Sequence, residues 1–267
     1  MQDAVAQLLS RAPGVRWGVS LRVDGRSVAE TASTDPMPTA SVGKILLLLE
    51  VARRIEEGLL DPTMRLTPEP NDLVADSGLW QHLDEPDLCV ASLAALVASV
   101  SDNLAANVLL REVSIDAVND VAMQCGLQHT RLLDRIRDHR GPEHPPAPSV
   151  GTADELARLM GAVAEGDAVS PAVSARVAGW LALDVDTSMV AGGLALDPLA
   201  HRDGPVRLFH KTGWDSGIRA DVGQVRGPCG EVSYAVLAVW DSGTQGVSAD
   251  VLEVMRAVGG LVGQVVR

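Results

Sequence analysis

A serine and a lysine stand three residues apart at the front of an apolar stretch. The order is Ser41-Val42-Gly43-Lys44, and the residues that follow predict a helix over 41–58. Residues i and i+3 share a helix face, so the Lys44 amine would reach the Ser41 hydroxyl. A hydroxyl becomes nucleophilic when a neighbouring base takes its proton, and burial or a second cation fits a lysine for that task. The plainer interpretation is a capping serine and a surface lysine.

A second motif, S-D-N, occupies residues 101–103 between two apolar helical segments. All three residue types begin helices well, so the motif is on one interpretation simply a helix start. On the other, Ser101 is a proton relay that faces Ser41, and Asn103 binds a substrate amide. The residues themselves leave both interpretations open.

A third motif, K-T-G, occupies residues 211–213 at the end of an apolar strand. It either forms a turn at the end of the strand or adds to a site. In the second case Lys211 is a second cation near Lys44, and Thr212 offers a hydroxyl to a substrate carboxylate. Gly213 would then let substrate lie against the strand.

The three motifs in this order resemble the signature set of class A β-lactamases and penicillin-binding proteins. Ser101 follows Ser41 by 60 residues, an interval similar to that of class A enzymes. The flanking text also resembles the family, in SDNLAANVLL after the second motif and TRLLDRIRD in the loop at 130–138. The resemblance covers nearly the whole chain and implies a serine hydrolase that works through an acyl-serine intermediate.

The resemblance assigns roles to residues of this sequence. It implies that Ser41 is the nucleophile, Lys44 its base, and Ser101 and Lys211 further members of the catalytic set. The backbone N–H groups of Ser41 and Trp214 would form an oxyanion hole.

Four residues would then bind substrate: Asn103, Thr212, Gly213 and Trp214. Trp214 either walls the pocket or is an ordinary packing residue. Arg219, eight residues after Lys211, either helps to hold a substrate carboxylate or is a surface arginine on a strand.

The chain departs from the family at the residue that should orient the deacylating water. The family places a glutamate there, but the alignment of TRLLDRIRD puts Arg137 at that position. Arginine stays protonated and cannot act as a base. The substitutes in the loop are Asp138 and Glu143, together with His139 and His144, and each taken singly is more simply a solvated loop side chain. We therefore expect acylation with weak turnover of β-lactams.

The elements that must position these residues indicate an α/β (α+β) fold of the β-lactamase type. Two short strands around Asp24-Gly25 and strands over 205–213, 219–227 and 232–240 predict an antiparallel sheet of about five strands built from both termini. Residues 60 to about 200 look mostly helical, with clear segments at 92–100, 103–113, 115–126 and 152–166. Further helices are expected over 2–12 and 248–266.

A single domain over 1–267 follows from this order of elements. We expect a sheet lobe of approximately 1–40 and 205–267 and an all-helical lobe of approximately 41–204. Thr152 and Glu155 form the sequence of a capping box at the start of the 152–166 helix.

The composition limits the partners. The formal charge is −13 and the pI is near 4.8, so a nucleic acid or an anionic membrane surface is disfavoured as a partner. The N-terminal residues lack the pattern of a secretory signal, which predicts a cytoplasmic protein unless a leader was trimmed. We expect a small-molecule substrate (an amide, ester or β-lactam) and no cofactor or metal. The oligomeric state stays open.

Two other functions compete with the hydrolase. A non-catalytic binder or sensor of a β-lactam-like ligand would have no need of a lysine base, and all three motifs are intact. A D,D-peptidase would share the acylation residues, but nothing in the sequence directs this chain to a cell wall.

Overall fold

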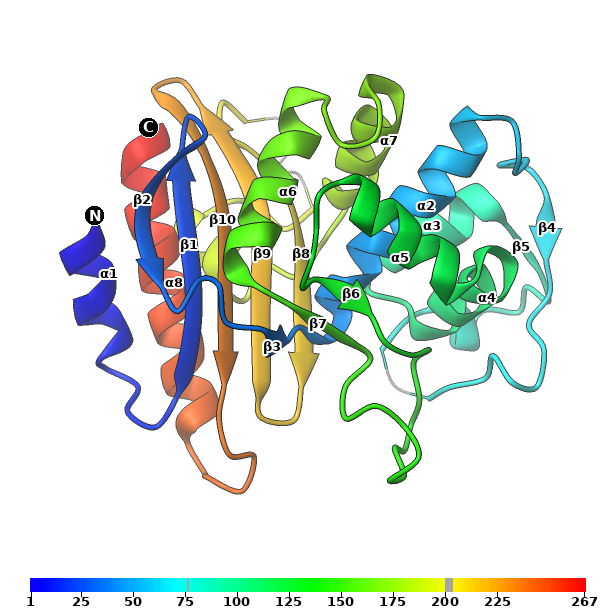
Figure 1. The fold of residues 1–267 in the computed structure, drawn as a ribbon, viewed down its shortest axis with the longest axis horizontal. Coiled ribbons are helices and arrows are strands. Elements are labelled where there is room, and N and C mark those ends of the chain that lie inside the picture. Colours follow the sequence, from blue (N-terminus) through cyan, green and yellow to red (C-terminus); the bar gives the residue numbers. More distant parts are fainter. Residues whose placement is uncertain (76, 200–203) are drawn as a thin grey trace.

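A five-stranded antiparallel sheet forms one side of the molecule in the computed structural model, which describes residues 1–75, 77–199 and 204–267 (Figure 1). The strands are β1 (Arg16–Val23), β2 (Arg26–Thr31), β8 (Arg207–Asp215), β9 (Ile218–Gly227) and β10 (Gly230–Val239). Their order is β2-β1-β10-β9-β8, so both ends of the chain build the sheet, as predicted. The β1–β2 turn places both Asp24 and Gly25 at positive φ, the conformation that a tight hairpin requires.

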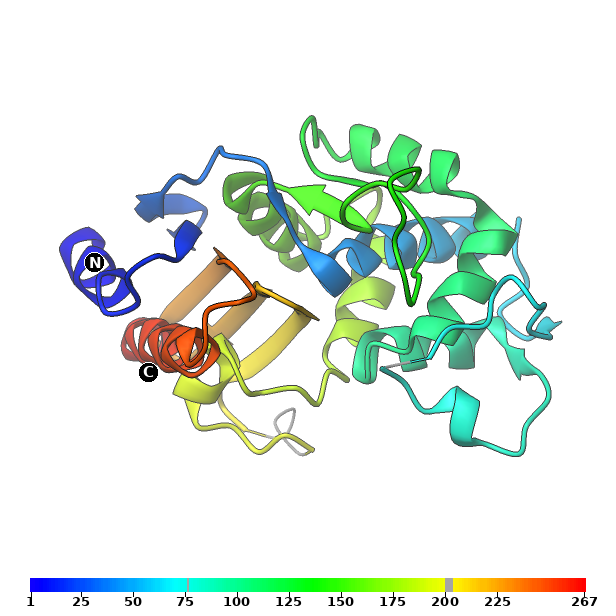
Figure 2. The same cartoon turned by 90° about the horizontal axis from the view of Figure 1, so that it is seen from below.

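Two terminal helices cover the outer face of the sheet (Figure 2). They are α1 (Gln2–Leu9) and the long α8 (Val247–Val266), which packs against the short 3-10 turn η3 (Val190–Leu194). Their buried apolar residues and those of the outer face form one hydrophobic core. None of the described helices is both long and apolar enough to cross a bilayer.

The opposite face carries α6 (Ala153–Glu165) and, beyond it, the helical part of the chain. Its central helix is α2 (Lys44–Glu56), whose residues 44–52 are all buried. Around it lie α3 (Val90–Ser99), α4 (Asn103–Val113), α5 (Ile115–Gln124) and α7 (Pro171–Leu181). A second hydrophobic core fills the space between these helices and the inner face of the sheet.

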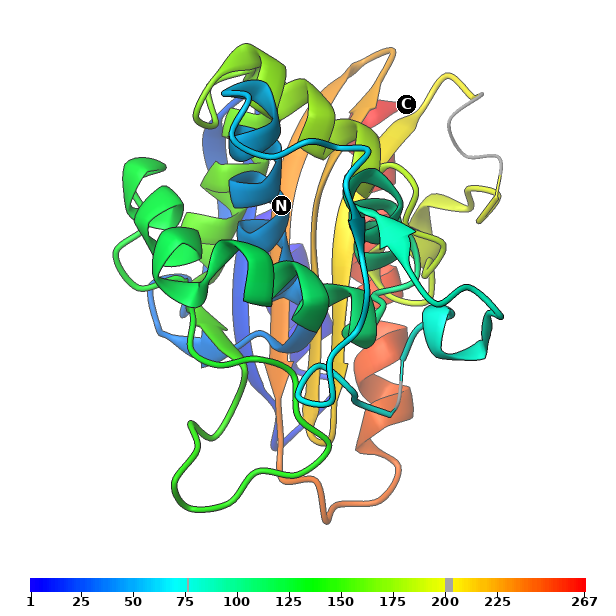
Figure 3. The ribbon, with the colours of Figure 1, turned by 90° about the vertical axis from the view of Figure 1, so that its right-hand side faces the viewer.

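Short strands hold the connections of the helical part in place. One group of three joins β3 (Met37–Pro38), β7 (Ser149–Gly151) and β6 (Arg131–Leu132), and β4 (Arg65–Leu66) pairs with β5 (Leu88–Cys89). The long loop between β6 and β7 extends at one end of the molecule (Figure 3).

Two expectations from the sequence need correction. Most of the segment 60–89 is not helical: it contains β4, β5 and the short turn η2 (Trp80–His82). The prolines at 62, 68, 70 and 86 explain this, because proline cannot continue a helix. The helix expected from residue 41 also begins differently, since residues 40–43 form the 3-10 turn η1 (Ala40–Gly43) and the α-helix starts at Lys44.

Candidate active site

The candidate nucleophile Ser41 lies on the η1 turn, and β7 packs against one side of this turn. The Ser149 hydroxyl donates to the Ala40 carbonyl at 2.7 Å and shares a 2.7 Å hydrogen bond with the Thr39 hydroxyl. A Cβ on Gly43 would meet the Ser149 side chain, with its Oγ at 2.7 Å. The glycine between serine and lysine therefore lets β7 approach the turn that carries Ser41.

Lys44 joins the first motif to the second. Its side chain is buried, and Nζ donates to the Ser101 carbonyl at 2.6 Å, the Asn103 Oδ1 at 2.6 Å and the Ser101 Oγ at 3.1 Å. Ser101 has a φ of 56°, a left-handed conformation that is uncommon for a residue other than glycine. This strained backbone brings both the carbonyl and the hydroxyl of one residue to the Lys44 amine.

The middle residue of the S-D-N motif builds the surrounding structure. One Asp102 oxygen caps α4 by accepting from the Ala105 N–H at 2.9 Å. The other oxygen accepts from the N–H groups of Leu79 at 2.7 Å and Trp80 at 2.8 Å. The helix-start interpretation therefore holds for Asp102, while Ser101 and Asn103 turn towards Lys44.

The third motif lies at the end of β8, beside the Ser41 turn. Lys211 is fully buried, and its Nζ lies 3.5 Å from Asp184 Oδ2, which also accepts from the Thr212 N–H at 3.3 Å. A Cβ on Gly213 would collide with the Thr39 carbonyl and lie 3.2 Å from the Ser41 nitrogen. Gly213 thus has a structural reason for its identity: it lets β8 run directly against the turn that carries Ser41.

Trp214 and Arg219 lie together at the mouth of the site. The Trp214 side chain is 60% exposed, and the Arg219 guanidinium is stacked 4.5 Å from its ring centre and 5.5 Å from that of Trp240. Guanidinium N–H groups of Arg219 donate to the carbonyls of Asp215 and Ile218 and to the Ser248 hydroxyl. The structure therefore places Arg219 behind Trp214, with several of its donors already engaged.

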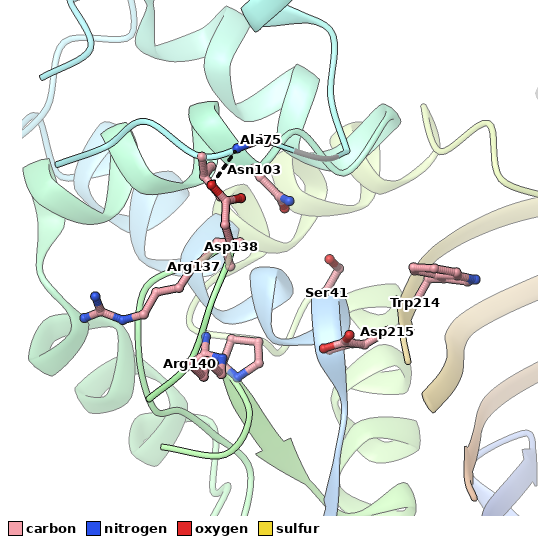
Figure 4. A pocket seen from close by; sticks show the side chains of 12 residues that line it. Ser41, Ala75, Asn103, Arg137, Asp138, Arg140, Trp214 and Asp215 are labelled. Carbon is pink, nitrogen blue, oxygen red and sulfur yellow. Dashed lines mark hydrogen bonds between the residues drawn. The ribbon is translucent and has the colours of Figure 1, made fainter. Parts of the chain in front are cut away.

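Arg137, which the sequence alignment puts at the position of the family's glutamate, is directed away from Ser41 (Figure 4). Its guanidinium binds Asp134 at 2.7 and 3.1 Å, and Arg140 binds the same carboxylate at 2.8 Å. Burial alone would raise the pKa of Asp134, but the hydrogen bonds from the two arginines prevail and lower it. Arg137 therefore serves the internal structure of the loop.

Asp138 is the carboxylate of this loop that faces the same cavity as Ser41. Its Oδ2 accepts from the Ala75 N–H at 3.2 Å. Glu143 is exposed and lies 3.2 Å from His144, and neither residue lines the cavities at Ser41 in the described part of the chain. His139 is also outside those cavities, so the structure separates Asp138 from the other three substitutes.

Two cavities meet at Ser41. The smaller, about 170 Å³, lies beneath the loop and is lined among others by Asp138 and Arg140. The larger, about 370 Å³, lies between the second and third motifs, and its walls include Ser101, Thr212 and two aspartates. Ser41, Asn103 and Trp214 line both cavities.

The sequence analysis missed those two aspartates, Asp184 and Asp186. They lie in the connection between α7 and η3, outside all three motifs. The one signal for them is the spacing in LALDVDTS, which puts two carboxylates on the same side of an extended segment.

Known proteins resemble this chain in sequence and in structure. The chain is 31% identical over 208 residues to a β-lactamase of Streptomyces lavendulae, covering 73% of this chain and 67% of that protein. A β-lactamase from Sphaerobacter thermophilus superposes with a TM-score of 0.84 at 24% identity, covering 97% of this chain and 98% of that one.

Two other solved structures extend the comparison. A class A β-lactamase of the last common ancestor of Gram-negative bacteria matches at a TM-score of 0.80 and 26% identity, over 98% of this chain and 97% of its own. A variant of PBP-A, solved as an acyl-enzyme complex with penicillin G, matches at a TM-score of 0.83 and 23% identity, over 98% and 94% of the two chains. The sequence model described as the β-lactamase enzyme family matches residues 1–266, and the chain belongs to that family.

Proposed function

We propose that this protein is a serine hydrolase that forms an acyl-serine intermediate on Ser41 with a small amide, ester or β-lactam. The observation that carries the proposal is the buried Lys44 amine, held by Ser101 and Asn103 next to the turn of Ser41. Such an amine is suited to take the hydroxyl proton during attack. The N–H groups of Ser41 and Trp214 would stabilise the oxyanion that forms at the substrate carbonyl.

In the proposed acylation, each proton that is removed is transferred to a named group. Ser41 Oγ bonds to the carbonyl carbon and its proton passes to Lys44, which must first lose one ammonium proton to solvent, and with it one of its three donated hydrogen bonds, to have a free lone pair. The bond between the carbonyl carbon and the leaving heteroatom then breaks, and this heteroatom takes a proton that Lys44 returns through the Ser101 hydroxyl. Lys211 places a second ammonium in the same region, paired with Asp184 at 3.5 Å, and Asn103 and Thr212 would orient the substrate.

Release of the acyl group is proposed to be slow for β-lactams, because Arg137 stands where the family's glutamate would activate water. Asp138 is the best-placed substitute for that glutamate, since it shares a cavity with Ser41. The names of similar proteins, including the penicillin G acyl-enzyme of the PBP-A variant, motivate β-lactams as probes.

Hydrolysis of p-nitrophenyl acetate tests the proposal, with Ser41→Ala as the variant and Ser216→Ala as the control. Ser216 is an exposed serine of the β8–β9 hairpin, outside both cavities. Loss of the nucleophile should reduce turnover by about 10³-fold or more, and the control should match the wild type. Turnover that survives in Ser41→Ala would refute the proposal.

Benzylpenicillin and a D-alanyl-D-alanine peptide distinguish the proposed hydrolase from the two alternative functions, the non-catalytic binder and the D,D-peptidase. Intact-protein mass spectrometry should reveal one adduct that is absent from Ser41→Ala and persists because release is blocked. Turnover at ordinary β-lactamase rates would contradict the role given to Arg137. Reversible binding of a β-lactam, with no adduct and no ester turnover, would favour the non-catalytic binder. Release of D-alanine from a D-alanyl-D-alanine peptide would favour the D,D-peptidase.

A further inference from the structure

The larger cavity at Ser41 has an acidic wall. Asp184 and Asp186 line it together with Ser101 and Thr212, and no lysine or arginine is among the described residues that do so. In the sequence analysis Thr212 and Arg219 were the candidates to hold a substrate carboxylate. In the structure Thr212 shares the cavity wall with Asp186, and the Nη groups of Arg219 already have acceptors.

Thr212 and Asp186 lie in the same cavity wall, close enough for the Thr212 hydroxyl to favour the ionised form of the Asp186 carboxyl. Ser188 also binds Asp186, and its N–H donates to Oδ1 at 3.1 Å. Burial by itself would raise the pKa of Asp186, but the hydrogen bonds from Ser188 and Thr212 prevail and lower it. Asp186 is therefore negatively charged, and it lies beside the Thr212 hydroxyl, which was the candidate to bind a substrate carboxylate.

The nearby cations form no ion pair with Asp186, although Arg219 and His210 are close enough to interact with its charge. Lys211 lies 3.5 Å from Asp184, so that pair neutralises itself. Arg219 does not line the cavity; its Nη groups donate to the Asp215 and Ile218 carbonyls and to Ser248, whereas its buried Nε has no hydrogen-bond partner among the described residues. Asp186 also lines the cavity. Among the described residues, no lysine, arginine or histidine lies within salt-bridge distance of its carboxylate.

The position of Ser101 decides which part of a substrate meets Asp186. In the proposed acylation the leaving group receives its proton through the Ser101 hydroxyl, so it must lie in the cavity that Ser41 and Ser101 share. That cavity is the one whose wall contains Asp186. A carboxylate on the leaving group would face a like charge, whereas an ammonium would find a partner.

We propose that the leaving group of the natural substrate carries a cationic nitrogen group, which Asp186 binds, rather than a carboxylate. This inference rests on the proposed function, and it makes Asp186 a specificity-determining residue of that reaction. β-Lactams carry a carboxylate next to the nitrogen that leaves on acylation. The inference therefore also predicts that β-lactams acylate Ser41 slowly.

Three thioesters with one acyl group and different leaving groups test the charge preference. Benzoylthiocholine is cationic, S-(3,3-dimethylbutyl) thiobenzoate is its neutral isostere, and 3-(benzoylthio)propanoate is anionic. All release a thiol that Ellman's reagent detects, and all leave the same benzoyl group on Ser41. The wild type should favour the cation over the anion in kcat/KM by about tenfold or more, with the neutral ester between them.

Asp186→Asn should reduce the cation-to-anion ratio by about tenfold and accelerate acylation by benzylpenicillin. Asp120→Asn removes one exposed carboxylate from α5, outside both cavities, and should keep the wild-type ratio. A ratio measured within one variant cancels any change that affects all three esters equally, such as a small disturbance of Thr212.

The outcomes separate the inference from the proposed function. Benzoylation of Ser41 without a preference for the cation, or with a preference that survives in Asp186→Asn, would overturn the inference and leave the acyl-serine chemistry standing. If none of the esters benzoylates Ser41, the proposed function fails and the inference falls with it.

Discussion

Asp138 is the residue on which the fate of an acyl-enzyme is proposed to depend. Its carboxylate is anchored by the Ala75 N–H and lines the cavity of Ser41, whereas Arg137 is tied to Asp134 and directed away. A general base must lie within reach of the attacking water, directly or through one further water. Within this loop that condition favours Asp138.

Asp138→Asn should lengthen the lifetime of acyl-Ser41 by about 10²-fold, the low end of what a general base contributes. The measurement is the decay of the acetyl adduct by intact-protein mass spectrometry after a pulse of p-nitrophenyl acetate. Glu143→Gln removes the exposed carboxylate from the same loop and serves as the matched control. An unchanged lifetime in Asp138→Asn, or a longer one in Glu143→Gln, would contradict this role.

At the residue scale, the family resemblance drew attention to Lys44, Ser101 and Asn103, which meet across 57 and 59 residues of chain. Asp184, which accepts from the Thr212 N–H across 28 residues, belongs to none of the three motifs, so neither a local pattern nor the resemblance pointed to it. The contacts of Arg219 could not be predicted from the sequence either, because its ring contact with Trp240 and its hydrogen bond to Ser248 involve other elements.

At the element scale, α6 holds the connection between α5 and β6 through Glu155. The Thr152 hydroxyl caps the helix as predicted, but the Glu155 carboxylate does not close the expected capping box. The Thr152 N–H donates instead to the Thr130 hydroxyl at 3.2 Å. The carboxylate accepts from the N–H groups of Gln128 and Thr130 at 2.8 Å, from the Thr130 hydroxyl at 2.7 Å and from the His129 N–H at 3.1 Å.

Glu155→Gln should destabilise the protein at neutral pH by about 1–3 kcal/mol, because a buried hydrogen-bonded charge is lost. Burial would raise the pKa of Glu155, yet the bonds from Thr130, Gln128 and His129 lower it from 4.5. The contribution of Glu155 is therefore complete above about pH 4.5 and is lost as the pH falls through the lowered pKa.

Urea unfolding of the wild type and of Glu155→Gln between pH 7 and pH 3 checks this. The difference in the free energy of unfolding should shrink below pH 4.5. Glu253→Gln, on the exposed side of α8, should differ little from the wild type throughout. A Glu155→Gln deficit that stays constant down to pH 3 would refute the proposed ionic role.

Elements with a strong pattern were predictable, and those set by neighbours were not. The strands β8, β9 and β10 lie within two residues of their predicted positions because their apolar runs end at glycine turns. The η1 turn was not distinguished from α2, because its contacts with Ser149 and with β8 come from segments far away in the sequence. In the segment 60–89 the prolines outweighed the apolar residues that suggested helices.

At the scale of the whole molecule, the candidate site lies where the sheet meets the helical part. β8 brings Lys211 and Thr212, α4 brings Asn103, and the turn before α2 brings Ser41. No single layer holds the whole set, so the site depends on how closely β8 and η1 approach each other. Gly213 is the point at which this approach is tightest, because a side chain there would collide with the Thr39 carbonyl.

Gly213→Ala should therefore separate β8 from η1, since the atoms it would strike are backbone and cannot move aside individually. The misplaced N–H groups of Ser41 and Trp214 should lower p-nitrophenyl acetate turnover by about 10²–10³-fold. The overpacked contact should lower the free energy of unfolding by about 1–3 kcal/mol. Gly260→Ala, where a Cβ meets nothing within 4 Å in α8, should leave turnover unchanged and raise stability by about 0.5–1 kcal/mol. Wild-type turnover in Gly213→Ala would mean that the site tolerates a wider gap between its two halves, and that the oxyanion hole does not depend on their contact.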